Sequence, residues 1–114
     1  APIRSRAYPG SGLTAVVSSS HLTQHTVEFL DKLSIAERVS FGSSLKFCRI
    51  AAGEADVYPR WGPTMEWDTA AGHAILSAAG GCVMTPEGEP LAYGKLKDGF
   101  RNGPFIAWGD KPLA

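Results

Sequence analysis

The feature that most constrains the fold is an alternation of short β-rich runs with segments of helical periodicity. Residues 13–17 form an apolar run that predicts a buried strand, and side chains then recur at helical spacing between Leu22 and Leu33. The alternation continues with a strand over 36–41, a helix over 45–52, a strand over 56–58 and a helix over 69–79. Such repetition is typical of an α/β sheet covered by helices. We therefore expect an α/β fold with a mostly parallel sheet of about five strands and helices on both faces.

The last third of the chain predicts shorter elements. Residues 82–85 and 91–93 flank a proline- and glycine-containing segment that predicts a hairpin loop, and residues 105–108 predict a final strand. The polar stretch 94–104 predicts a surface loop. At 114 residues the chain is long enough for one core but not for two, so we expect one domain.

Charge and cysteine content exclude several classes of partner. The 11 basic and 11 acidic side chains balance, whereas a protein that binds a nucleic acid polymer normally has a basic excess. A small phosphorylated ligand needs only a few local cations and stays open. Two cysteines without a Cys-x-x-Cys motif predict reduced thiols and a cytoplasmic protein, with peripheral attachment to the inner membrane left open. No apolar run reaches the roughly 20 residues of a membrane span.

Polar side chains cluster where predicted strands end and helices begin, the place where open α/β sheets bind ligands. His21 follows a serine run after the first strand, and Ser43 and Lys46 follow Gly42 at the start of a helix. Free N–H groups, hydroxyls and a lysine at a helix start can hold an anion. From the pattern alone, a serine cap with a solvated lysine is the favoured interpretation.

Two further side chains have open alternatives. Asp68 lies where the N-cap of the 69–79 helix is expected, and the pattern alone favours a capping role over ligation of a hard cation such as Mg²⁺. Arg60 lies between aromatic residues, where a phosphate contact and a surface role covering Trp61 are equally supported.

The segment Trp67-Asp68-Thr69-Ala70-Ala71-Gly72, followed by Ala79-Gly80-Gly81, resembles the C-terminal signature of the inositol monophosphatase superfamily. Within that superfamily, the run from Gly42 to Cys48, the run from Asp56 to Thr64 and the run from Val17 to His21 are similar to bisphosphate nucleotidases of the bacterial CysQ type. The resemblance extends from about Val16 to Ala107.

The resemblance implies a function and a set of roles. Members of this branch remove the 3'-phosphate from adenosine 3',5'-bisphosphate, giving AMP and phosphate, with magnesium. By motif, Asp68 is then a magnesium ligand at the substrate. His21, Ser43, Lys46 and Arg60 are then contacts to the nucleotide or to its retained 5'-phosphate.

The resemblance also identifies what these residues lack. The family's other metal ligands lie in an N-terminal half with a G-E-E-type glutamate and a D-P-x-D-G-T segment, and neither motif occurs here. We therefore expect residues 1–114 to be a C-terminal domain, inactive alone, whose partner is the N-terminal half of the same enzyme; a homodimer stays open. The alternatives are an inositol monophosphatase or sugar bisphosphatase, and a non-catalytic nucleotide-binding domain.

Overall fold

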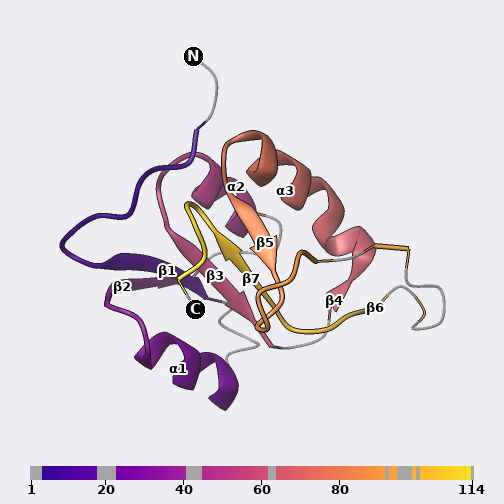
Figure 1. The fold of residues 1–114 in the computed structure, drawn as a ribbon, viewed down its shortest axis with the longest axis horizontal. Coiled ribbons are helices and arrows are strands. Elements are labelled where there is room, and N and C mark those ends of the chain that lie inside the picture. The colour runs from indigo at the N-terminus through magenta and orange to yellow at the C-terminus, as the bar shows by residue number, and fades with distance from the viewer. Residues whose placement is uncertain are drawn as a thin grey trace.

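A computed structural model describes residues 4–17, 23–40, 45–61, 64–91, 93–94, 99 and 101–113. They form a five-stranded sheet of order β2-β1-β3-β7-β5, three helices and a separate two-stranded sheet (Figure 1). The strands are β1 (Leu13–Val17), β2 (Ile35–Ser40), β3 (Val57–Arg60), β4 (Thr64–Met65), β5 (Cys82–Met84), β6 (Arg101–Asn102) and β7 (Phe105–Trp108). The helices are α1 (Gln24–Asp31), α2 (Leu45–Ala51) and α3 (Glu66–Ala78).

The five-stranded α/β sheet is confirmed, and its directions are mixed. Strands β2, β1 and β3 are parallel, as the strand–helix alternation predicted. Strand β7 is antiparallel to both β3 and β5. After the crossover through α3, strand β5 does not pair with β3 directly. The final strand, β7, lies between β3 and β5 and runs in the opposite direction to both. The parallel part therefore lies on the β2 side, and the antiparallel part surrounds β7.

Helices cover both faces of the sheet, also as expected. Because side chains alternate across a strand, each buried strand contributes to two cores. On one face Phe29 and Leu30 of α1 pack with strand residues that include Val57 and Trp108. On the other face α2 and α3 pack through one core that includes Phe47, Ile50, Leu76, Tyr58, Val83 and Phe105.

The predictions were wrong at the end of β3 and in the 94–104 stretch. Strand β3 was expected to stop before Pro59, yet it continues to Arg60, and Pro59 is paired with Ile106 of β7. Strand β3 pairs with β1 at Val57, which is opposite Ala15 and two residues before Pro59. The missing N–H of Pro59 therefore removes no hydrogen bond at that position. The 94–104 stretch was expected to be a loop, but part of it forms β6, which pairs with β4.

Two glycines allow α3 to pack closely. A Cβ at Gly72 would lie 2.7 Å from Cδ2 of Phe47 on α2, and a Cβ at Gly81 would lie 2.5 Å from the carbonyl oxygen of Trp108. Real Cβ atoms do not approach backbone oxygen so closely, so only glycine fits at position 81. These two positions explain physically why glycines occur in and after this helix.

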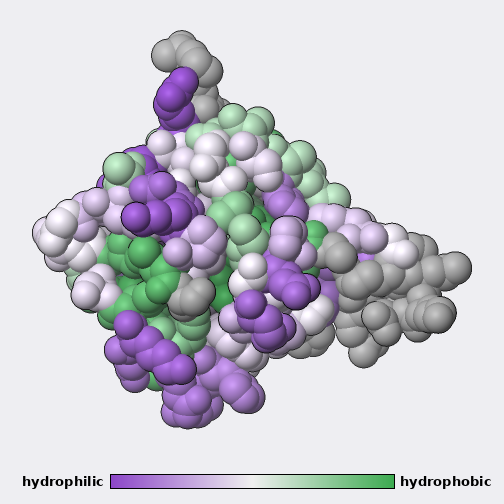
Figure 2. Space-filling model, in the orientation of Figure 1, coloured by the Kyte–Doolittle hydropathy of each residue, from purple (hydrophilic) through white to green (hydrophobic). Residues whose placement is uncertain are grey.

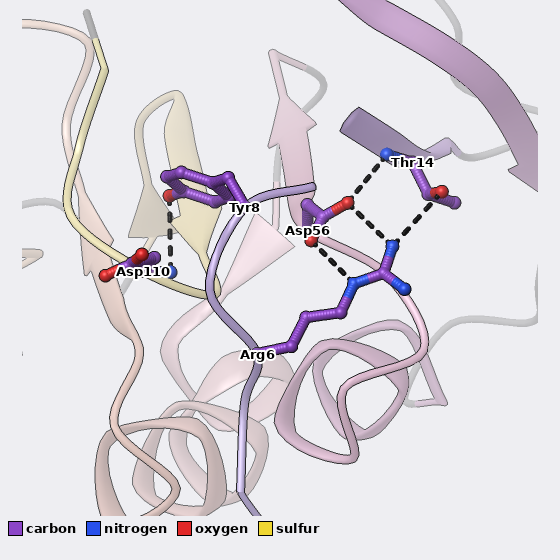
Figure 3. Close-up of polar contacts among 5 residues, drawn as sticks. All are labelled: Arg6, Tyr8, Thr14, Asp56 and Asp110. Atoms are coloured by element: carbon purple, nitrogen blue, oxygen red, sulfur yellow. Dashed lines mark hydrogen bonds and ion pairs between the residues drawn. The ribbon is translucent and has the colours of Figure 1, made fainter. Parts of the chain in front are cut away.

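The N-terminal segment is held at the amino ends of the parallel strands (Figure 3). The guanidinium of Arg6 donates to both carboxylate oxygens of Asp56, at 2.9 and 2.8 Å, and the backbone N–H of Thr14 donates to the same carboxylate at 2.8 Å. Tyr8 accepts from the N–H of Asp110, so the first and last segments lie side by side. None of the helices in the described part of the chain has the length and apolar content needed to cross a bilayer.

Candidate functional site: a buried cation cluster and a helix carboxylate

Lys46 and Arg60 are brought together around the phenol ring of Tyr58. Lys46 is the second residue of α2, and its Nζ lies 5.4 Å from the ring centroid of Tyr58. Arg60 ends β3, and its Nη1 lies 3.4 Å from Tyr58 Oη, to which it donates. Lys46 is 2% exposed and Arg60 9% exposed. The pattern-based interpretation of a solvated lysine was therefore wrong, and so was that of an arginine at the surface.

The surroundings of Lys46 disfavour its charged form. Burial lowers the pKa of Lys46, and the positive charge of Arg60 lowers it further. Burial raises the pKa of Tyr58, so its hydroxyl stays protonated at neutral pH and supplies no negative charge. The described part of the chain places no carboxylate in an ion pair with Lys46. A buried lysine that lies near a second cation and has no ion pair with a described carboxylate is a position that an anionic ligand would stabilise.

The Tyr58 ring, which contacts both cations, packs against two further aromatic rings. Phe47, Tyr58 and Phe105 lie with ring centroids 5.5 to 5.8 Å apart, and Tyr58 is edge-on to the other two rings. Edge-to-face packing fixes the plane of the phenol ring. The ring in turn presents one face to Lys46 and its hydroxyl to Arg60.

Asp68 is the third residue of α3 and not its N-cap, which corrects the expected helix start. The helix begins at Glu66, and Met65 is the N-cap. The carboxylate of Asp68 reaches back and accepts a hydrogen bond from the backbone N–H of Met65 at 2.9 Å. An acidic side chain at this position satisfies a free donor and opposes the positive end of the helix dipole. Asp68 thus stabilises the start of α3, but from the third helical position and not from the N-cap.

Only one oxygen of Asp68 is used in this way. Oδ2 accepts from Met65, while Oδ1 makes no hydrogen bond to a described residue, and the side chain is exposed. A carboxylate oxygen of this kind fits Mg²⁺, which prefers hard oxygen ligands. Across the described residues, however, no group of three or more histidine, cysteine, aspartate or glutamate side chains could hold a metal ion. Asp68 therefore has one carboxylate oxygen that a cation could approach, and a complete metal site here would need ligands from outside the described residues.

A buried polar network beneath Asp68 was missed by the sequence analysis. The Asn102 side-chain amide donates to Thr64 Oγ1 at 3.0 Å, to the Met65 carbonyl at 3.1 Å and to Thr69 Oγ1 at 3.1 Å. Asn102 is 2% exposed. It thus holds the carbonyl of Met65, the residue whose own backbone N–H donates to Asp68. No local signal indicates this role, because Asn102 lies in a polar stretch and meets its partners only through the β4–β6 pairing.

A second branch of the network anchors the 93–94 segment. Tyr93 Oη donates to Thr69 Oγ1 at 3.2 Å and lies 2.8 Å from Nδ1 of His73, while the N–H of Gly94 donates to buried Glu66 at 2.7 Å. Burial lowers the pKa of His73. The first two turns of α3 are thus held from two sides.

The site residues predicted from sequence are only partly brought together. Lys46 and Arg60 share one cluster, whereas no described contact joins either of them to Asp68. The three still share one edge of the molecule, because α2 and α3 follow the carboxyl ends of the parallel strands β2 and β3. This is the edge at which open α/β sheets bind ligands. His21 and Ser43 lie outside the described residues.

Comparison with known proteins gives consistent matches. The profile of the inositol monophosphatase family matches residues 8–103. The 3'(2'),5'-bisphosphate nucleotidase CysQ of Escherichia coli K12 is 49% identical over 90 residues, which cover 75% of this chain and 37% of CysQ. A Rhizobium leguminosarum bv. phaseoli protein, named only by its location in the pss 5' region, is 53% identical over 87 residues, covering 73% of this chain and 92% of that protein.

Solved structures agree with this result. The crystal structure of CysQ from Bacteroides thetaiotaomicron has a TM-score of 0.78 at 43% identity, covering 94% of this chain and 41% of that one. An inositol monophosphatase from Zymomonas mobilis shares the fold, with a TM-score of 0.75 at 24% identity. The chain thus spans well under half the length of these CysQ relatives. Because the family profile covers most of its residues, the chain belongs to the inositol monophosphatase family.

Proposed function

We propose that this chain is the nucleotide-binding part of a magnesium-dependent 3'(2'),5'-bisphosphate nucleotidase. The enzyme would hydrolyse the 3'-phosphate of adenosine 3',5'-bisphosphate to give AMP and inorganic phosphate. One observation carries the proposal: Lys46 and Arg60 form a buried cation cluster around Tyr58 at the ligand-binding edge of the sheet. The similarity to CysQ names the substrate class that such a cluster would serve.

The proposed roles follow from charge and position. A nucleoside bisphosphate carries a second phosphate that stays on the product, and Lys46 with Arg60 would bind this retained 5'-phosphate. Arginine offers a planar pair of donors and lysine a point charge, a combination suited to a phosphate group. Ser43 and His21 are assigned to the nucleotide by their motifs alone.

Asp68 is the proposed magnesium ligand of this chain. When bound, magnesium would supply a Lewis acid for the phosphoryl and leaving oxygens. The contribution of the chain is to hold the Asp68 carboxylate in one orientation through Met65 and Asn102. The further carboxylate ligands are proposed to lie in an N-terminal metal-binding half, with residues 1–114 as the C-terminal domain. The isolated chain is accordingly proposed to be inactive.

The proposal is tested in an enzyme that joins this domain to its metal-binding half. We expect Lys46→Met to reduce kcat/KM for adenosine 3',5'-bisphosphate far more than for inositol 1-phosphate, since only the bisphosphate has the retained phosphate. Lys32→Met is the matched control, because Lys32 is an exposed lysine at the end of α1. Equal losses for both substrates would contradict the assignment of Lys46.

The metal role has its own test. Asp68→Asn keeps the size and one oxygen of the side chain but removes its charge, so we expect a large loss of magnesium-dependent phosphate release and weaker magnesium binding by calorimetry. Near-normal activity and magnesium affinity would exclude Asp68 as a ligand. Phosphate release by the isolated 114-residue chain with magnesium would contradict the proposed division into two halves.

Two alternatives remain distinguishable by the same measurements. An inositol monophosphatase or sugar bisphosphatase shares the fold, as the Zymomonas mobilis structure illustrates. It would prefer the sugar phosphate and tolerate Lys46→Met with that substrate. A non-catalytic nucleotide-binding domain would bind AMP through Lys46 without phosphate release in any context.

A further inference from the structure

Two aromatic rings face each other where strand β3 ends and helix α1 begins. They are the indole of Trp61, the residue after β3, and the imidazole of His25, in the first turn of α1. Their planes are nearly parallel, at 11°, and their centroids are 6.3 Å apart. These two residues are called here the aromatic pair. Neither ring makes a hydrogen bond or an ion pair with a described residue.

The indole of the aromatic pair is held in place by further rings. Trp61 contacts Phe29 of α1 with ring centroids 5.5 Å apart and planes tilted by 46°. Phe29 in turn lies edge-on to the buried Trp108 of β7, at 6.0 Å. Residues four positions apart lie on one side of a helix, so His25 and Phe29 both reach Trp61 from α1. The indole is therefore a fixed surface, anchored through Phe29 to the core.

The imidazole of the aromatic pair, in contrast, is free to move. His25 is exposed, and the outer side of α1 around it is hydrophilic, as the purple atoms at the lower left of Figure 2 show. Exposed side chains change rotamer rapidly. A third ring sandwiched between two others needs roughly 7 Å between the outer planes, twice the contact distance of carbon atoms. A rotation of His25, with the indole unmoved, can therefore open the aromatic pair for one flat ring.

The aromatic pair lies beside the topological switch point of the sheet. In the order β2-β1-β3-β7-β5, strand β1 is followed by α1 and leads outward to β2, whereas β3 is followed by α3 and leads outward to β5 on the other side. His25 comes from the helix after β1 and Trp61 from the end of β3, so the two rings come from the two sides of this point. Open α/β sheets bind ligands in the crevice at such a point.

The aromatic pair is joined to the cation cluster by one peptide. Arg60 and Trp61 are consecutive, yet they lie on opposite faces of the sheet. Arg60 donates to Tyr58, which belongs to the core under α2 and α3, and Trp61 packs with the core under α1. Side chains alternate across a strand in this way. A ligand that crosses the carboxyl end of β3 would thus meet cations on one side and flat rings on the other. A nucleotide has matching parts, because its ribose joins a phosphate to a flat base.

We propose that the aromatic pair is the subsite for the base of the nucleotide, which stacks on Trp61 and is covered by His25. That the ligand is a nucleotide rests on the proposed function. Stacking requires only a flat π-face, so this subsite favours the larger rings of purines over pyrimidines without selecting one purine by hydrogen bonds. The aromatic pair contributes affinity for the base, and Lys46 with Arg60 contributes affinity for the phosphate.

The test measures ligand binding by the enzyme that joins this domain to its metal-binding half. AMP has a base and a phosphate, ribose 5-phosphate has only the phosphate, and adenosine has only the base. We expect AMP and adenosine, but not ribose 5-phosphate, to quench the fluorescence of Trp61, measured as the difference between the wild type and Trp61→Phe. By calorimetry, Trp61→Leu should weaken AMP binding roughly tenfold and leave ribose 5-phosphate binding unchanged, while Trp61→Phe retains most of the AMP affinity.

His25→Leu should weaken AMP binding by a smaller factor, because it removes only the cover of the base. Gln24→Leu is the matched control, since Gln24 is exposed in the same helical turn and bonds to Glu28. It should leave AMP binding unchanged. Equal losses of affinity for AMP and ribose 5-phosphate in Trp61→Leu would overturn the proposal. The absence of Trp61 quenching by AMP and adenosine in the folded wild type would also overturn it, even where Trp61→Leu does not fold. Quenching by adenosine together with an unchanged AMP affinity in Lys46→Met would contradict only the proposed function.

Discussion

At the scale of single residues, Lys46 is costly to the fold. It is a lysine with 2% of its surface exposed, beside the buried Arg60 and a protonated phenol. Taking an ammonium group out of water is unfavourable unless a partner compensates it, and the lowered pKa of Lys46 expresses this cost. A residue that weakens the free protein in this way is typical of a binding site.

This cost can be measured with Lys46→Met, which keeps the length of the side chain and removes its charge. We expect the free energy of unfolding of the isolated chain to rise by about 1 kcal/mol at neutral pH. The pH dependence has a defined sign. The unfolded chain binds more protons than the folded one between the lowered pKa of Lys46 and 10.5, so wild-type stability rises with pH across that window. Urea unfolding across this range should show the rise in the wild type and a smaller one in Lys46→Met. A variant less stable than the wild type would contradict the buried-charge interpretation.

At the scale of elements, α3 determines where Asp68 lies. Its first turn is held by Asn102 through Met65 and Thr69, and its last turn is followed by Gly81 at the Trp108 carbonyl. The helix is thus fixed at both ends by strands that come much later in the chain. Rigid elements held in this way position a ligand more accurately than loops.

Gly81→Ala tests the fixed C-terminal end of α3. The added Cβ would lie 2.5 Å from a backbone oxygen that cannot rotate away, so strand β7 or the helix end must shift. We expect a loss of about 3 kcal/mol in the free energy of unfolding. Gly103→Ala is the matched control, because nothing lies within 4 Å of its added Cβ and its backbone is not in the left-handed region. Thermal unfolding that is the same for both variants would contradict the close approach of α3 to β7.

At the scale of the whole molecule, the contacts that hold the chain ends and the residues of the proposed binding site lie at opposite ends of the sheet. The Arg6–Asp56 pair and the Tyr8–Asp110 contact join both chain ends to the amino ends of the parallel strands. Arg60 is the last residue of β3, and Lys46 and Asp68 lie on helices that follow the parallel strands in the chain. Changes at the first end should therefore alter stability with little effect on the proposed nucleotide site.

Arg6→Met tests this separation. It leaves the fully buried Asp56 carboxylate with only the N–H of Thr14 among its described partners. We expect a loss of about 2 kcal/mol, below the range for a fully buried pair, because the Arg6 side chain is 37% exposed. The Arg38–Asp31 pair is exposed on both sides and 3.6 Å apart, so Arg38→Met should cost less than about 0.5 kcal/mol. A double-mutant cycle of Arg6→Met with Asp56→Asn measures the coupling, and no coupling would contradict the bidentate contact.

The periodicity of the sequence was enough to predict most elements. The residues that a helix or strand buries on one face recur at a fixed spacing, which is visible within the segment itself. The strand of residues 13–17, the helix ending at Ala51 and the final strand 105–108 are confirmed within one residue at each end. The helix of Asp68 was placed three residues too late, because its start is satisfied by a carboxylate from the third position, a reach-back that the one-residue N-cap rule does not include.

What the sequence determined by itself was the class of fold and the family, which depend on local pattern and motif; the same motifs supplied the proposed site residues. The tertiary structure decided the insertion of β7 between β3 and β5, the β4–β6 pairing that buries Asn102, and the burial of Lys46 against Tyr58. It also decided that Trp67 and Ile75 of α3 are exposed while Thr69 and Leu76 of the same helix are buried. These features depend on contacts between residues far apart in the chain, and the physical reason they escape sequence reasoning is that no local pattern records which distant surface a side chain will meet.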